Sequence, residues 1–179
     1  MMAMQAIYRV RQGLNNLSAT ARPEDAALAA RYLTQTEQRF FARMEVADQK
    51  HCVGVLKYLL RRGMEDRQLL KAALLHDVGK SRSRISVFHR TAAVLLRAIF
   101  GEVPSFLTWI GGERLWGPFY VLENHPRLGA VMLAKAGCDE RVWRLAELHH
   151  VDPKLLNLTD DAEWMQAALW ALRKADSES

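Results

Sequence analysis

The chain is poor in cysteine and lacks the long apolar runs that mark membrane-spanning proteins. Its 179 residues include only two cysteines, Cys52 and Cys138, whose spacing does not form a metal-binding pair. We interpret both as small buried side chains in a reducing compartment. No stretch reaches the roughly 20 apolar residues that span a bilayer, and the N-terminal residues show no apolar core of a secretory signal. These absences predict a cytoplasmic protein without a membrane span.

The sequence also lacks a long run of basic residues, although its net charge is +5. The lysines and arginines are scattered, so we predict no nucleic-acid-binding arm. The positive charge suits a ligand that carries phosphate, and a solvated surface of lysine and arginine explains it equally well. Half of the residues are hydrophobic and a quarter are charged, which is typical of one globular domain with a sizeable core.

Proline, glycine and helix-capping residues divide an almost wholly helical pattern. No alternating strand pattern, internal repeat or linker is present, so the sequence predicts an all-α fold. Residues 101–124 contain two prolines and four glycines, and we interpret them as loop and short helical pieces. A new helix is expected after Asn124. The other expected helices cover residues 24–45 (one or two helices), 48–62, 65–77, 86–100, 139–150 with Asp139 as N-cap, and 161–175 with Asp160 and Glu163 as a capping box.

Several histidines and aspartates fall on helix faces that should be buried. His76 follows Leu69 and Ala73 at helical spacing, and Asp77 borders the same face. The same spacing aligns three more residues with apolar stripes: His51 with Val55 and Leu59, His149 with Val142 and Leu145, and Asp176 with Met165, Leu169 and Leu172. Taken alone, each histidine is explained more simply as a hydrogen-bonded core residue, and Asp176 as a solvated charge. We interpret the remaining His89 as a surface residue.

Together, these residues predict a divalent cation. A buried carboxylate is costly unless it is paired or binds a metal. Imidazole and carboxylate ligands suit Fe, Mn, Co, Ni or Zn better than Ca.

These residues resemble the pattern of the HD-domain metal-dependent phosphohydrolase superfamily, which has an early His, a His-Asp pair, later histidines and a final Asp. The match covers about 48 to 176. It lacks the His-His-Glu and Gly-Tyr-Pro segments of the branch that cleaves cyclic di-GMP, because HHVDPKLLNL stands there. The matching segments are DQKHCVGVLKYL with His51, ALLHDVGK with His76 and Asp77, ENHPRLGAVML with His125, AELHH with His149, and ALWALRKADSES with Asp176, for which Asp160 and Asp161 are weaker alternatives.

The resemblance implies a fold and a set of metal ligands. The chain would form a single-domain HD-type helical bundle of about seven or eight helices. Residues 46–179 would be the metal-binding helical domain, and residues 1–45 a helical extension packed on it. The ligand set implied for the first metal is His51, His76, Asp77 and Asp176. Asp77 would bridge to a second metal held by His125 and His149. His150 would be a further metal ligand, a substrate contact or a residue that hydrogen-bonds a ligand. Whether the site holds one ion or two remains open.

The resemblance also implies a function. The protein would be a phosphohydrolase or phosphodiesterase that hydrolyses a nucleotide or similar small phosphoester through a metal-activated water. Asp77 would position or deprotonate the water, and Lys80 would contact the substrate phosphate. A lysine at a helix C-terminus explains Lys80 equally well. The alternatives are a di-iron HD-type oxygenase, and a non-catalytic module that binds a metal or a nucleotide.

The apolar segment 101–124 has no assigned role in this pattern. It could cover the site or stack on a base through its four ring side chains, although a core or dimer contact is the simpler explanation. These residues are Trp109, Trp116, Phe119 and Tyr120. Glu102, Glu113 and Arg114 interrupt the segment, which disfavours peripheral membrane contact by this stretch. The expected partner is a small phosphorylated substrate, and a homodimer remains open.

Overall fold

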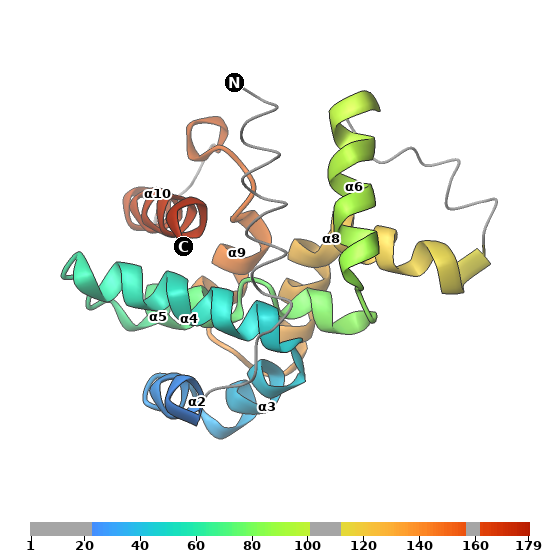
Figure 1. The fold of residues 1–179 in the computed structure, drawn as a ribbon. Coiled ribbons are helices and arrows are strands. Elements are labelled where there is room, and N and C mark those ends of the chain that lie inside the picture. Colours follow the sequence, from blue (N-terminus) through green and yellow to red (C-terminus); the bar gives the residue numbers. More distant parts are fainter. Residues whose placement is uncertain (1–22, 101–111, 157–161) are drawn as a thin grey trace.

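The computed structural model describes residues 23–100, 112–156 and 162–179, which contain eight α-helices, two short 3₁₀ helices and no strand (Figure 1). The predicted all-α class and helix number are therefore confirmed. In chain order the elements are α2 (Pro23–Ala30), α3 (Gln35–Arg43), α4 (Val46–Arg61), α5 (Arg67–Leu75), η2 (Val78–Arg82), α6 (Val87–Phe100), α8 (Gly112–Lys135), α9 (Glu140–Leu148), η3 (Pro153–Leu155) and α10 (Ala162–Glu178).

Local sequence signals set many of the helix ends. The Thr34 hydroxyl accepts a hydrogen bond from the Glu37 backbone N–H, and the Glu37 carboxylate accepts one from the Thr34 backbone N–H. These two bonds form a capping box at the start of α3. Asp66 and Asp139 cap the starts of α5 and α9 with their side chains, the latter as predicted. Gly63 and Gly137 follow α4 and α8 with positive φ, a conformation that favours glycine after a helix. The predicted capping box at Asp160 lies outside the described residues.

The main core lies between α4, α5, α9 and α10, and α2 and α3 cover the far side of α4 and α5 (Figure 1). Its fully buried side chains include Leu56, Leu74, Leu145 and Leu172, one from each of these four helices. Ala29 of α2 and Phe41 of α3 belong to the same core. The division of the chain at residue 45 stays a prediction, and residues 1–22 lie outside the described part.

Helix α8 corrects one expectation. Our prediction of loop and short helical pieces up to Asn124, followed by a new helix, is wrong for residues 112–124, because one helix runs from Gly112 to Lys135 with Pro118 and Pro126 inside it. Each proline removes one N–H from the helix, which we took for a stop signal. Packing outweighs this loss, because Phe119 and Leu122 are buried in a second core with Ala93 of α6. Residues 101–111 lie outside the described part.

Among the described residues, no helix combines the length and the apolar character that crossing a bilayer requires.

Candidate metal centre

The structure brings all seven predicted metal ligands together from five parts of the chain. They come from α4, the junction between α5 and η2, α8, the end of α9, and α10. We call His51, His76, Asp77 and Asp176 the first ligand group, and His125, His149 and His150 the second ligand group. Within the trios His51–His76–Asp77 and His125–His149–His150, the potential ligand atoms lie within 4.8 Å of one another. Asp176 joins the first group through its Oδ1, which is 2.7 Å from His51 Nε2 and 3.5 Å from His76 Nε2.

Asp77 lies between the two ligand groups. Its Oδ1 is 3.2 Å from His125 Nε2 and 4.0 Å from His149 Nε2. Its Oδ2 is 3.7 Å from His76 Nε2 and 2.5 Å from Lys80 Nζ. One buried carboxylate therefore faces imidazoles of both groups, which is the arrangement a bridging ligand requires.

Three histidines are oriented by the same hydrogen bond. The Nδ1 atom of each bonds the backbone carbonyl three residues earlier: His76 to Ala73 at 3.0 Å, His125 to Leu122 at 2.8 Å and His149 to Ala146 at 2.7 Å. A carbonyl only accepts, so Nδ1 carries a proton and Nε2 is the atom left for a metal. Burial lowers the pKa of His76, but Cys52 and Asp77 outweigh it and raise this pKa well above its usual value, so a metal would displace a proton from His76 Nε2. Metal-binding histidines are typically held in this way.

The accepting carbonyls are available for local reasons. Ala73 and Ala146 lie in the last turns of α5 and α9, where helix carbonyls lose their backbone donors. Leu122 lies inside α8, and its usual donor would be the N–H of residue 126. That residue is Pro126, which has no N–H. The His-Pro pair thus leaves the Leu122 carbonyl to the imidazole of His125.

The buried Nε2 atoms show that these residues fit a metal ion. The Nε2 atoms of His76, His125 and His149 are buried and have no hydrogen-bond partner among the described residues. Leaving such an atom unpaired costs about 1–3 kcal/mol. Each faces the Asp77 carboxylate, and a divalent cation bound by imidazole nitrogen and carboxylate oxygen would use all three lone pairs.

The electrostatics also favour a cation. Burial raises the pKa of Asp77, but Lys80 and His76 outweigh it and hold this pKa well below its usual range. Partial burial likewise raises the pKa of Asp176, whereas its hydrogen bond with His51 and the nearby His76 imidazole lower it further than burial raises it. Both carboxylates are therefore ionised at neutral pH. Burial and the neighbouring His76 lower the pKa of His149 well below its usual value, so its imidazole is neutral and able to bind a metal.

The sequence reasoning did not find the role of Gly79. A Cβ atom at Gly79 would lie 2.0 Å from the His125 carbonyl oxygen and 2.7 Å from the Gly129 backbone nitrogen. Only a residue without a side chain lets η2 approach α8 this closely. This approach sets the position of Asp77, two residues earlier, relative to His125. The glycine of the His-Asp-x-Gly segment was the available signal.

A second missed feature is the ion pair between the buried Asp48 of α4 and the partly buried Arg90 of α6. The two Nη nitrogens of Arg90 donate to the two oxygens of the carboxylate, at 2.9 and 2.8 Å. Asp48 precedes Cys52 and Val55 at helical spacing, so the pattern that placed His51 could have identified it as buried. Its partner lies 42 residues away and gives no sequence signal.

The structure tests only some of the predictions for the remaining residues. Lys80 pairs with Asp77 rather than with helix carbonyls, and its contact with substrate stays a prediction. Phe119 is buried, in line with the core interpretation, and Tyr120 is exposed. The side chains of Trp109 and Trp116 are outside the described part. His89 is partly buried beside Ser86 and joins neither ligand group.

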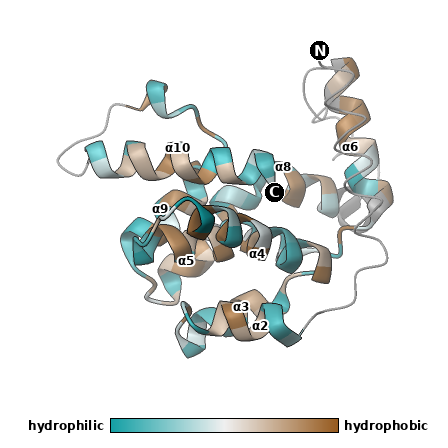
Figure 2. Cartoon of the chain, turned by 60° about the vertical axis from the view of Figure 1, so that its left-hand side comes forward, coloured by the Kyte–Doolittle hydropathy of each residue, from teal (hydrophilic) through white to brown (hydrophobic). Residues whose placement is uncertain are grey.

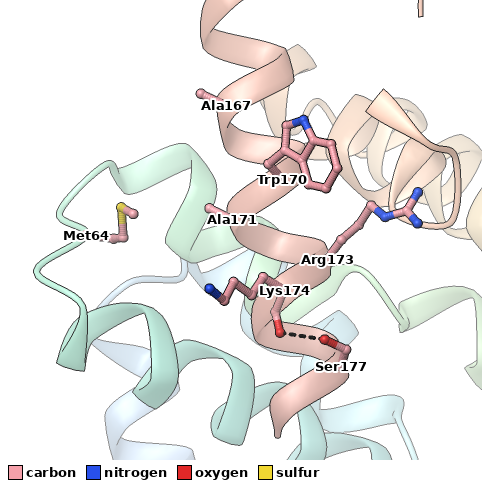
Figure 3. Close-up of a pocket in the computed structure, with 7 residues that line it drawn as sticks. All are labelled: Met64, Ala167, Trp170, Ala171, Arg173, Lys174 and Ser177. Carbon is pink, nitrogen blue, oxygen red and sulfur yellow. Dashed lines mark hydrogen bonds between the residues drawn. The ribbon is translucent and has the colours of Figure 1, made fainter. Parts of the chain in front are cut away.

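A shallow hollow of about 590 Å³ lies along α10, where Trp170, Arg173 and Lys174 line it and Met64 stands opposite (Figure 3). None of the seven predicted ligands lines it. We therefore give it no part in the site.

The family comparison matches the same residues. An HD domain model matches residues 49–176, a span that contains all seven predicted ligands. The chain belongs to the HD domain family. Its motifs are thus those of the HD-domain metal-dependent phosphohydrolase superfamily, as the sequence resemblance predicted. Comparison with curated proteins and with solved structures gave no match. The HD domain family suggests the general chemistry, and the substrate has to be inferred from the site.

Proposed function

We propose that this HD domain protein is a metal-dependent phosphohydrolase or phosphodiesterase that acts on a nucleotide or a similar small phosphoester. The observation that carries the proposal is the set of three buried Nε2 atoms without partners, which surround the Asp77 carboxylate between two ligand groups. One or two divalent ions, chosen from Fe, Mn, Co, Ni and Zn, would be held there. A bound divalent ion lowers the pKa of coordinated water and polarises a phosphoryl oxygen.

The protein side chains would divide the remaining work. Asp77 is ionised and has Oδ1 directed at the second ligand group, so it would orient the attacking water or take its proton. Lys80 Nζ, held by Asp77, would place a positive charge beside the substrate phosphate. His150 is exposed while its ring lies 5.1 Å from that of His125, so it would meet the substrate at the outer edge of the site.

The first experiment counts metal per chain in the wild type and in His125→Ala. Loss of a second-group ligand should reduce about two ions to about one if both groups bind. His89→Ala is the matched control, because this histidine belongs to neither group. An equal count of one in wild type and His125→Ala would limit the site to one ion. No metal in the wild type after reconstitution would contradict the proposal.

Activity is then tested on small phosphomonoesters, phosphodiesters and nucleotides with each candidate metal. Asp77→Ala should abolish hydrolysis and metal binding together, because Asp77 faces both groups. Full activity in this variant would exclude the mechanism. An absorbance change on air oxidation of the iron-loaded protein, without hydrolysis of any phosphoester, would instead support an HD-type oxygenase. Metal or nucleotide binding without turnover would support a non-catalytic module.

A further inference from the structure

Helix α6 exposes a stripe of large apolar side chains. Phe88, Leu95 and Ile99 are 74%, 55% and 71% exposed. At about 100° per residue they fall within roughly 40° of one another around the helix. The opposite side carries Ala93, which packs in the second core with α8. Figures 1 and 2 show α6 at the edge of the described bundle, with its C-terminal end extending beyond the other described helices. Exposed apolar patches of this kind usually mark a contact site.

The charge of this segment has one sign. Between residues 78 and 101 the sequence holds five basic residues and no acidic one. Lys80 and Arg90 face the carboxylates of Asp77 and Asp48. Arg82, the last residue of η2, and Arg84, in the turn that leads from it into α6, are exposed, and no ion pair joins them to another described residue.

We propose that α6 and the basic turn before it form a docking surface for an anionic lipid bilayer. The apolar stripe of Phe88, Leu95 and Ile99 would enter the boundary between headgroups and acyl chains, as interfacial helices do. Arg82 and Arg84 would contact the lipid phosphates, since basic residues near such a surface are attracted to it. This contact lies on the membrane surface and does not require a spanning helix.

Other occupants fit these residues less well. A symmetric dimer through α6 would bring the same basic segment of two copies together, and juxtaposed like charges oppose association. A nucleic acid would explain the arginines but would leave three large apolar side chains without a partner. An anionic bilayer accounts for both the stripe and the charge.

The test is co-sedimentation of the full chain with vesicles of phosphatidylcholine alone and of phosphatidylcholine mixed with phosphatidylglycerol in equal parts. The wild type should bind the mixed vesicles more tightly, and added salt should weaken the binding. The triple variant Phe88→Gln, Leu95→Gln, Ile99→Gln should weaken it at least about tenfold. Arg82→Gln with Arg84→Gln should also weaken it about tenfold or more.

The matched control is Val131→Gln with Leu155→Gln, which changes two exposed apolar residues outside α6 and should bind like the wild type. Helical circular dichroism confirms that each variant is folded. Failure of the wild type to bind, or equal binding by the triple variant, would overturn the proposal. If the wild type binds no vesicles but forms a dimer that the triple variant does not form, the bilayer proposal is overturned. The partner of α6 would then be a second copy of the chain. The assay needs neither metal nor substrate, so its outcome is independent of the proposed hydrolysis.

Discussion

At the scale of single residues, Asp77 links the charge balance of the core to the proposed chemistry. It is buried, it faces imidazoles of both ligand groups, and its closest partner is the Lys80 ammonium. The aspartate and the lysine are three residues apart, so η2 needs only one turn to present both. In this setting the Asp77 carboxylate stays ionised. The Lys80 ammonium beside it supplies a positive charge that an anionic substrate could approach.

Lys80→Met separates the role of the ammonium from that of the ligands. Because Lys80 belongs to neither ligand group, the variant should keep its metal. Loss of one charge-assisted contact of about 1.5–3 kcal/mol should lower kcat/KM for the phosphoester about 10- to 100-fold. Metal analysis and steady-state kinetics measure both effects. Lys57→Met is the control, since Lys57 pairs with Asp25 of α2 and should leave kinetics unchanged. Wild-type kcat/KM in Lys80→Met would remove Lys80 from the catalytic site.

At the scale of secondary-structure elements, the contact of η2 with α8 places the two ligand groups side by side. Gly79→Ala should force these backbones apart, because its Cβ would overlap the His125 carbonyl. We expect a loss of about 3 kcal/mol or more in the free energy of unfolding, measured by urea denaturation. Gly117→Ala, in the facing helix α8, is the matched control. Its Cβ meets nothing within 4 Å, so it should raise stability by about 0.5–1 kcal/mol. Equal effects of the two changes would refute the close approach.

Pro126 provides a second prediction at this scale, in which stability and metal binding change in opposite directions. Pro126→Ala returns an N–H to the Leu122 carbonyl and makes it compete with His125 Nδ1. The helix should become more stable, since proline in a helix interior costs about 3 kcal/mol. Metal affinity of the second ligand group should fall about tenfold, as for other changes behind a metal ligand. Thermal unfolding and metal titration test this pair of effects.

The control for Pro126→Ala is Pro118→Ala, which also restores an N–H within α8. The carbonyl that this N–H would bond is not one that a predicted metal ligand uses. It should leave metal affinity unchanged. Unaltered affinity in Pro126→Ala as well would show that the proline does not orient His125.

At the scale of the whole molecule, helical periodicity explains why so much of the site was predictable. His76 and His149 continue apolar stripes, so a 3.6-residue period was sufficient to turn them inward. The full length of α8 was not predictable, because Pro118 and Pro126 are local stop signals that distant packing overrides. The partners of Gly79 and Asp48 were also missed. Both depend on contacts across the fold, at the His125 carbonyl and at Arg90, which no local pattern encodes.

The same long-range arrangement predicts that metal removal loosens the entire bundle. The ligands come from α4, the α5–η2 junction, α8, α9 and α10, so a bound ion would tie together segments from residue 51 to residue 176. Binding at 100 times the dissociation constant adds about 2.7 kcal/mol per site. For a chain of this size, 1 kcal/mol changes Tm by about 2–4 °C. A chelator should therefore lower Tm by about 5–10 °C per ion, and metal readdition should restore it.

Differential scanning calorimetry before and after chelation measures this shift, and Asp77→Asn is the control because it should respond little to the chelator. Without an ion, the core holds two ionised carboxylates near three unpaired imidazole nitrogens. The shift should therefore be accompanied by faster hydrogen exchange at the ends of α5 and α9, where His76 and His149 would each lose a bound ion. A metal-loaded wild type whose Tm and exchange are both insensitive to chelation would mean that burial and hydrogen bonding alone hold these side chains in place.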